Sequence, residues 1–209
     1  MKPLNMEILR SAQDFTARWG FLTQEIFFEF FCPMSQAQQY RYWAWLVDQG
    51  YFYKSNANPQ VLLLTKKSRI RFGSLARPSR LPTYVTHDAI VARVFLAFHR
   101  RGLIVKSWLE DELMRNPIDA YKVLGAERIH RVPDLVFDLK TADGSGIRCA
   151  LEIERVTKSQ SRYSKIALAY LGCSRVSVIL FGCGQEATER AIRNAFNGKE
   201  FAAKNRIRA

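Results

Sequence analysis

The sequence has few of the residues that form disulfides or bind transition metals. Its 209 residues include only four cysteines and three histidines. No cysteines are spaced as in a C-x-x-C pair and the histidines are scattered, which argues against a structural zinc site. Each cysteine lies among apolar residues, so we expect buried thiols and no need for an oxidising compartment.

Long apolar runs are also missing. None approaches the roughly 18 residues that a membrane-spanning helix needs. The first residues lack the basic-then-apolar order of a signal peptide. Internal repeats and low-complexity tracts are likewise missing from the sequence. We therefore expect a cytoplasmic protein with no membrane partner.

Acidic residues are scarce relative to basic ones. The 19 Asp and Glu against 32 Lys and Arg give a formal net charge of +13. Such an excess favours a polyanionic partner, most often nucleic acid, and the alternative is a solvated basic surface. The hydrophobic fraction of 48% is sufficient for a packed core.

A stretch rich in Pro, Ser and Gly divides the chain in two. Residues 73–85, GSLARPSRLPTYV, have little hydrophobic periodicity and predict a linker. The expected domains are residues 1–76 and 86–209.

The first part predicts three helices followed by a hairpin. Apolar residues at helical spacing precede Gly20, Thr23 can cap a second helix that ends at Pro33, and Ser35 can cap a third. Two short strand-like runs then surround an Asn-Pro turn. This is the order of a winged helix-turn-helix domain.

The candidate DNA contacts fall in two groups. Polar side chains at the start of the third helix suit contacts in a major groove; they are Gln36, Gln38, Gln39, Arg41 and Tyr42. Basic side chains after the second strand suit phosphate contacts from a wing; they are Lys66, Lys67, Arg69 and Arg71. Winged helices also serve in dimerisation and protein docking, but the net charge favours DNA.

The second part predicts alternating helices and strands. An amphipathic helix ends at Gly102, a strand turns into an acidic helix, and two strands flank an Asp-Gly turn. A helix, a buried strand and a last helix follow. This order predicts an α/β (α+β) sandwich with a mixed sheet.

Carboxylates interrupt the two hairpin strands of this second part. Alternation places Glu152 and Glu154 on one face of IRCALEIER, and Asp134 and Asp138 on one face of the preceding strand. Clustered buried carboxylates are costly unless a positive charge lies between them, and a divalent cation with oxygen ligands would supply it. The alternative is an edge hairpin whose acids lie in solvent, paired with arginines, namely Arg148 and Arg155.

These residues resemble the PD-(D/E)xK nuclease superfamily, in which Pro-Asp begins one core strand and Glu-x-Lys lies in the next. By position, Asp134 matches the aspartate and Glu152 the glutamate, whereas Glu154 stands in place of the lysine. Some members take the lysine from a following helix, which makes Lys165 the first candidate here and Lys158 the second.

The resemblance also implies a metal site. Family members often add an acid from the helix ahead of the core strands, a place that Glu112 or Glu110 would take. The implied catalytic residues are Asp134, Glu152, Glu154, Lys165 and Lys158. The implied ligands for Mg²⁺ or Mn²⁺ are Asp134, Glu152 and Glu112.

The order of motifs over most of the chain is similar to replication-relaxation and MobC-type plasmid mobilisation proteins. The motifs are a His-led helix (THDAIVARVFLAF), SWLEDEL, the Pro-Asp strand, LEIER and SKIALAY. The resemblance implies site-specific nicking of double-stranded, supercoiled plasmid DNA at a transfer origin, with relaxosome proteins as partners. A homodimer of this chain is a further expected partner. The His-hydrophobe-His site of the better-known relaxases is missing from the sequence.

Two functions follow from these observations. The first is a metal-dependent DNA endonuclease, a relaxase-like nickase of plasmid mobilisation (conjugation) or replication, and the clustered acids favour it. The second is a DNA-binding regulator or relaxosome accessory protein with a degenerate nuclease fold. The missing lysine within the strand favours this second function. Tyr163 and Tyr170 are expected to be core or DNA-contacting residues.

Overall fold

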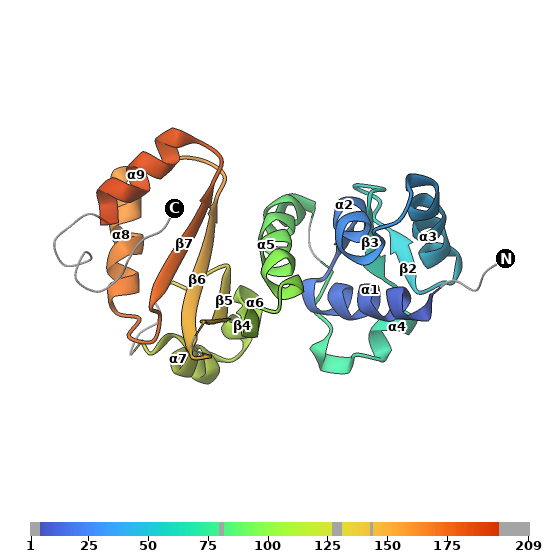
Figure 1. Ribbon diagram of the computed structural model, residues 1–209, viewed down its shortest axis with the longest axis horizontal. Coiled ribbons are helices and arrows are strands. Elements are labelled where there is room, and N and C mark those ends of the chain that lie inside the picture. The colour runs from blue at the N-terminus through green and yellow to red at the C-terminus, as the bar shows by residue number, and fades with distance from the viewer. Residues whose placement is uncertain (1–4, 80–81, 127–130, 143, 197–209) are drawn as a thin grey trace. The chain divides into compact units, whose positions relative to one another are not determined.

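The protein is described here from a computed structural model that covers the whole chain. It describes residues 5–79, 82–126, 131–142 and 144–196. The chain has a mixed α/β fold with two separate sheets (Figure 1). By its internal contacts it divides into an N-terminal unit, Met1–Leu96, and a C-terminal unit, Ala97–Ala209. The division falls inside helix α5 (Pro82–Arg100).

Capping residues define the first helices of the N-terminal unit. The Asn5 side chain accepts a hydrogen bond from the backbone of Glu7 at the start of α1 (Met6–Trp19), and Gly20 ends that helix at φ 82°. The Thr23 hydroxyl likewise accepts from Ile26 N at the start of the second helix. The expected caps at Gly20 and Thr23 are confirmed.

The remaining helical segments of this unit are short, apart from α3. They are α2 (Gln24–Ile26), the π-helical η1 (Phe27–Phe31), α3 (Gln36–Asp48), α4 (Lys66–Ile70) and the 3₁₀ turn η2 (Gly73–Leu75). Aromatic side chains fix how they pack: Phe27 lies 5.6 Å from Trp43 between ring centroids, and Phe15 stacks on Trp19 at 5.7 Å.

A small antiparallel sheet completes the N-terminal unit. Its strands are β1 (Leu22–Thr23), β2 (Phe52–Lys54) and β3 (Val61–Leu64), in the order β1-β3-β2. The hairpin of β2 and β3 flanks the Asn-Pro turn as the sequence predicts. All four residues of β3 are buried because this central strand is covered on both faces.

The helices beyond the hairpin differ from expectation. The basic run predicted as a wing lies on α4, which begins where the Thr65 hydroxyl accepts a hydrogen bond from Ser68 N. The predicted linker 73–85 contains η2 and the first turn of α5. Residues up to Leu96 of α5 belong to the N-terminal unit, where Phe95 lies 5.8 Å from Trp19 between ring centroids.

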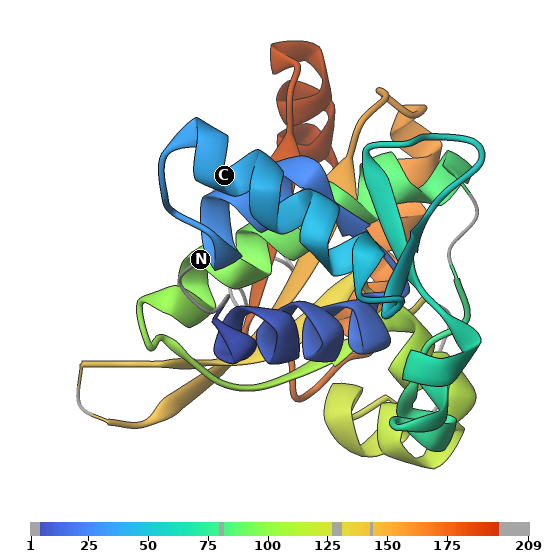
Figure 2. The same cartoon turned by 90° about the vertical axis from the view of Figure 1, so that its right-hand side faces the viewer.

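The C-terminal unit contains one mixed four-stranded sheet. Its strands are β4 (Ile104–Leu109), β5 (Leu135–Lys140), β6 (Gly146–Glu154) and β7 (Val178–Cys183), paired in that order. The first three strands are antiparallel and β7 runs parallel to β6. The paired ends of β5 and β6 project from the unit (Figure 2). The predicted mixed sheet is confirmed.

Helices cover one face of this sheet. They are α6 (Glu110–Arg115), α7 (Pro117–Leu124), α8 (Gln160–Leu171) and α9 (Glu186–Phe196), and α8 and α9 lie over β6 and β7 in Figure 1. Helix α7 lies between α6 and β5 and is not among the elements that the sequence predicts. Its start has the Asn116 side chain accepting from Asp119 N, with Pro117 in the first turn.

The helix-covered face holds the buried core of the unit. Val136 and Ala150 from the sheet pack with Ile166 and Ala167 of α8 and with Phe196 of α9. Within the part of the chain that the structure describes, no helix combines the length and the apolar character needed to cross a membrane.

Candidate functional site

The acid-bearing residues of β5 and β6 share one face of the sheet. Val136 pairs with Ala150 and Asp138 pairs with Arg148, so the even-numbered side chains of both strands lie on the same side. This is the face under α8. Glu152 and Glu154 are 1% and 3% exposed there, which makes them buried acids in a basic protein.

Arginine and tyrosine side chains hold the Glu152 carboxylate. Arg131 Nε donates to Glu152 Oε1 at 2.6 Å and Nη2 donates to Oε2 at 2.5 Å. The Tyr170 hydroxyl donates to Oε1 at 2.6 Å. Both carboxylate oxygens therefore accept hydrogen bonds, and the arginine binds in the two-pronged geometry that suits a carboxylate.

Burial and charge act in opposite directions on this carboxyl group. Burial raises the pKa of Glu152 above its usual value, whereas the hydrogen bonds and charge of Arg131 lower it. Burial and the Glu152 charge raise the pKa of Tyr170 well above its usual range, so its hydroxyl stays protonated and acts as a donor.

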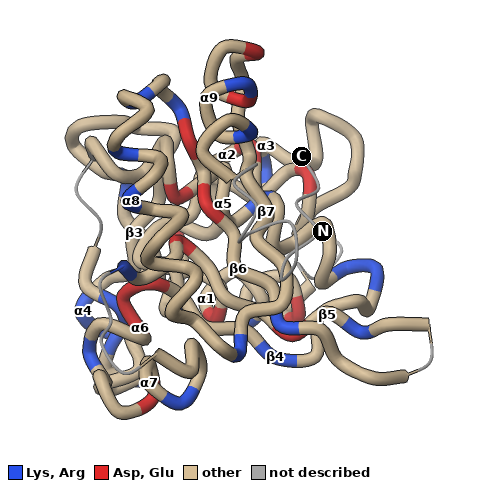
Figure 3. Tube along the Cα trace, turned by 90° about the vertical axis from the view of Figure 1, so that its left-hand side faces the viewer, with Lys and Arg blue, Asp and Glu red and all other residues tan. Residues whose placement is uncertain are grey.

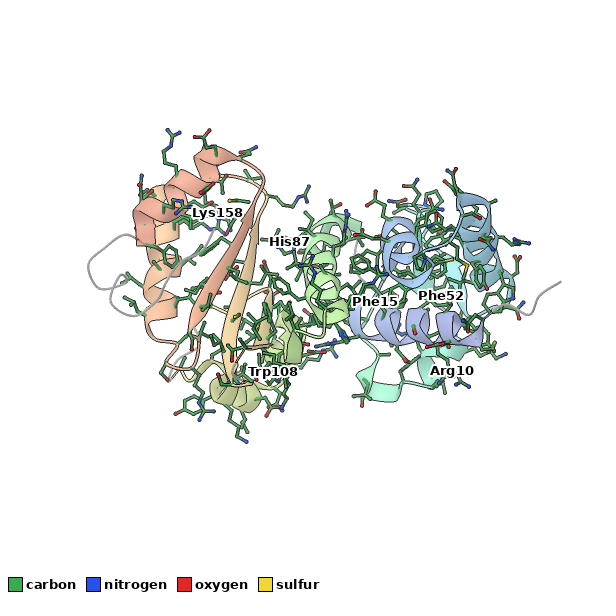
Figure 4. All side chains as sticks on the ribbon, viewed as in Figure 1. Arg10, Phe15, Phe52, His87, Trp108 and Lys158 are labelled. Atoms are coloured by element: carbon green, nitrogen blue, oxygen red, sulfur yellow. The ribbon has the colours of Figure 1, made fainter. Side chains whose placement is uncertain are left out.

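Glu154 pairs mainly with Lys158, and Arg131 Nη2 also lies 4.0 Å from its Oε1. Lys158 Nζ donates to Glu154 Oε1 at 2.5 Å, from the segment between β6 and α8 (Figure 4). The backbone N–H of Lys158 donates to the Tyr163 hydroxyl at 3.2 Å, which ties this segment to α8. Tyr163 and Tyr170 are both buried, as expected of core aromatics.

Asp134 lies just before β5 and binds the backbone of the neighbouring strand. Its Oδ2 accepts a hydrogen bond from Ile153 N at 2.7 Å. This contact extends the β5–β6 pairing by one residue beyond Leu135 and Leu151. The side chain therefore has a structural role in aligning the two strands.

The edge-hairpin alternative, in which the acids pair with arginines, applies only toward the turn between β5 and β6. Asp138 and Arg148 form a two-pronged ion pair, with Nε–Oδ1 at 2.8 Å. The Arg148 guanidinium also lies 5.0 Å from the ring centroid of Trp108, labelled in Figure 4. Glu152 and Glu154 differ from Asp138, because they are buried.

The acids in this arrangement do not fit a metal site. Glu152 and Glu154 are bound by cations of the chain itself, and Asp134 by a backbone amide. Glu112 caps its own helix, since its Oε2 accepts from Leu109 N at 2.7 Å. Over the described ranges, no group of three or more His, Cys, Asp or Glu residues is placed to hold a metal ion.

Lys165 is not brought to the acids. It is exposed on α8 and makes no ion pair with any described acid. Instead it lines a pocket together with Arg131. Lys158 is therefore the candidate lysine that reaches an acid, and it reaches Glu154.

The candidate DNA contacts on α3 divide into exposed and structural side chains. Gln36 and Arg41 are exposed. Gln38 Oε1 accepts from the backbone of Ser35 at 3.2 Å, and Gln39 Nε2 donates to the carbonyl of Cys32 at 3.1 Å.

The other candidate DNA contacts also differ in exposure. The Tyr42 hydroxyl accepts from Asn5 N at 3.2 Å. Lys66 and Lys67 are exposed on α4, and Arg69 beside them is half-buried. Arg71 is exposed and its Nη1 lies 3.4 Å from Gln13 Oε1 of α1.

Sequence reasoning missed Arg131 as the partner of Glu152. The signal available was a buried strand acid that needs a nearby cation, with Arg131 three residues before Asp134. Which basic side chain of several fills that place depends on the tertiary structure.

Comparisons of the chain with protein-family models, with curated proteins and with solved structures find no match in any of the three.

Proposed function

We propose that this chain is a DNA-binding protein whose N-terminal unit is a winged helix-turn-helix and whose C-terminal unit is a nuclease-like fold without cleavage activity. In this role it acts as a regulator or as an accessory protein of a DNA-processing complex. Double-stranded DNA is the partner, as the net charge of +13 favours.

The element order supports the winged-helix assignment. Helix α1, strand β1, the α2–η1 segment and α3 are followed by the β2–β3 hairpin, and the strands pair in the order β1-β3-β2. In such domains the helix before the hairpin enters the major groove. Here that helix is α3, and its exposed Gln36 and Arg41 suit contacts with base edges and phosphates.

The Glu152 contacts are the main support for a binding role without cleavage. A metal ion at Glu152 would have to displace a guanidinium that binds both carboxylate oxygens in a buried position. A divalent cation and Arg131 would also repel each other. The charge of the acids is already compensated by Arg131 and Lys158, so burial of these carboxylates requires no ion.

A second candidate function is metal-dependent cleavage of DNA with Mg²⁺ or Mn²⁺. One observation favours it: Glu152 and Glu154 share the buried face of β6, and Asp134 lies beside them at the start of β5. This function requires Arg131 and Lys158 to leave the carboxylates when DNA and metal bind.

The experiment that separates these functions measures binding and nicking by one preparation. Supercoiled plasmid and short duplexes are incubated with wild type, Asp134→Ala, Glu152→Ala and the exposed control Glu186→Ala, with and without Mg²⁺ or Mn²⁺. We expect duplex binding that falls with salt and no nicking by any variant. Metal-dependent nicking by wild type and Glu186→Ala, lost in the other two variants, would establish the endonuclease instead.

The choice of DNA follows from the motif resemblance to plasmid mobilisation proteins. A plasmid transfer origin is therefore the first DNA to test, beside an unrelated sequence of equal length. Tighter binding to the transfer origin than to the unrelated duplex is the expected result for a relaxosome accessory protein.

A further inference from the structure

A pocket of about 580 Å³ lies beside α8 in the C-terminal unit. Its described lining consists of three cationic and three apolar side chains: Arg131, Arg162, Lys165, Ile166, Leu168 and Ala169. No acid belongs to that described lining. Figure 3 shows the Lys and Arg positions of α8 in blue along the helix.

The cations of α8 at this pocket have no acidic partner among the residues that the structure describes. Arg162 and Lys165 are exposed, and neither forms an ion pair with a residue that the structure describes. By contrast, on α9 Arg190 pairs with Glu186 at 3.2 Å and Arg193 with Glu189 at 2.7 Å. Among the described residues, the pocket thus concentrates positive charge with no acid in its lining.

Arg131 adds a fixed donor to the pocket. Its contacts with Glu152 use Nε and Nη2, and Nη1 makes no hydrogen bond within the described residues. The bound carboxylate holds the guanidinium in place, so little side-chain entropy is lost when an anion binds the remaining edge. A preoriented arginine with two nearby cations is an arrangement that suits phosphate oxygens.

We infer that this pocket binds a backbone phosphate of DNA, which gives the C-terminal unit a DNA contact of its own. This inference rests on the proposed function, since DNA is the source of the phosphate. The apolar side chains Ile166, Leu168 and Ala169 form the rest of the described lining and suit the sugar beside the phosphate. Glu152 acts here as a positioning residue, because it orients Arg131.

The test uses the full chain with both α8 cations removed. Binding of a short duplex by wild type and by Arg162→Ala/Lys165→Ala is measured by fluorescence anisotropy over a range of salt concentrations. Loss of the contact lowers the slope of log Kd against log salt by about one for each phosphate released. The matched control, Arg190→Ala/Arg193→Ala, removes two exposed arginines that already have acidic partners and should keep the wild-type slope.

A second measurement keeps the pocket and the proposed function separate. Calorimetric titration with pyrophosphate should show binding to wild type and to the α9 control, and none to Arg162→Ala/Lys165→Ala. If the duplex binds but its slope is the same in wild type and in the α8 variant, the DNA contact is overturned while the proposed function stands.

If the duplex does not bind at all, the proposed function fails and the pyrophosphate result decides about the pocket. Pyrophosphate binding that requires Arg162 and Lys165 would then support a phosphate site that takes a free phosphate compound. No pyrophosphate binding would overturn the site. Because both substituted side chains are exposed, the circular dichroism spectrum of the variant should match that of wild type.

Discussion

The pairing of Arg131 with Glu152 explains how a buried strand tolerates an acid. The carboxylate is 1% exposed, whereas the arginine side chain is 27% exposed. Removing the arginine therefore leaves a charge in the protein interior, while removing the acid leaves a charge that can reach water. The two substitutions should have unequal effects.

We expect Arg131→Ala to lower the free energy of unfolding by about 2–4 kcal/mol at pH 7. Glu152→Gln keeps an acceptor for Tyr170 and should cost about 1 kcal/mol. In Arg131→Ala/Glu152→Gln the loss should be smaller than in Arg131→Ala alone. Urea unfolding of the four proteins measures the coupling.

The sign of the pH dependence follows from the raised pKa of Glu152. Without Arg131 the pKa of this buried carboxyl rises further, so the folded state binds a proton more readily than the unfolded chain. Stability then falls as the pH rises from the unfolded pKa, about 4.3, through the folded one. The destabilisation by Arg131→Ala should thus be smaller at pH 5 than at pH 7. An equal loss at both pH values would show that carboxylate charge is not its cause.

At the scale of elements, the C-terminal end of α7 at Gly125 packs closely against Ser174 and Arg175. Gly125 ends this helix at φ 68°, and its carbonyl accepts from the Ser174 hydroxyl at 2.7 Å. A Cβ at position 125 would lie 2.5 Å from Ser174 Oγ and 3.0 Å from Arg175 N. Position 125 therefore excludes a side chain both by its dihedral angle and by its neighbours.

We expect Gly125→Ala to destabilise the protein more than Gly102→Ala. Gly102 also ends a helix, at φ 67°, but a Cβ there meets nothing within 4 Å. The control should cost about 1 kcal/mol for its backbone conformation alone, and Gly125→Ala at least about 1 kcal/mol more. Equal unfolding free energies for the two variants would contradict the close approach.

Local sequence signals predicted most of the helices and strands. Contacts between residues far apart in the sequence were not predictable. Gly20 and Thr23 bound helices because their capping chemistry is local, and the alternation in IRCALEIER placed Glu152 and Glu154 on one face. Helix α7 is missing from the predicted order, although Asn116 and Pro117 form a local helix start. As partners of these acids the sequence predicted a metal ion or, in the edge-hairpin alternative, Arg148 and Arg155. In the folded chain Arg131 and Lys158 take that place.

At the scale of the whole molecule, the excess of basic residues predicts salt-sensitive DNA binding. Exposed cations of the N-terminal unit include Arg41 on α3 and Lys66 and Lys67 on α4. Each phosphate contact contributes about one ion to the salt dependence. Arg41 lies on α3, whereas Lys66 and Lys67 lie on α4. Substituting each residue separately therefore tests which of them contacts DNA.

We expect Arg41→Ala to weaken duplex binding and to lower the salt slope by about one. Arg193→Ala, whose side chain pairs with Glu189 on α9, is the control and should leave the slope unchanged. Anisotropy titrations at several salt concentrations measure both. A wild-type slope for Arg41→Ala would remove the start of α3 from the DNA interface.

The cations that neutralise the buried acids also affect how the chain can evolve. Because Glu152 depends on Arg131, and Glu154 on Lys158, a change at one position creates pressure for change at its partner. In related sequences, residues 131 and 152 should therefore change together, and residues 158 and 154 should also change together. A nuclease centre would instead hold its acids invariant while the cations drift, so the pattern of covariation itself distinguishes binding from cleavage.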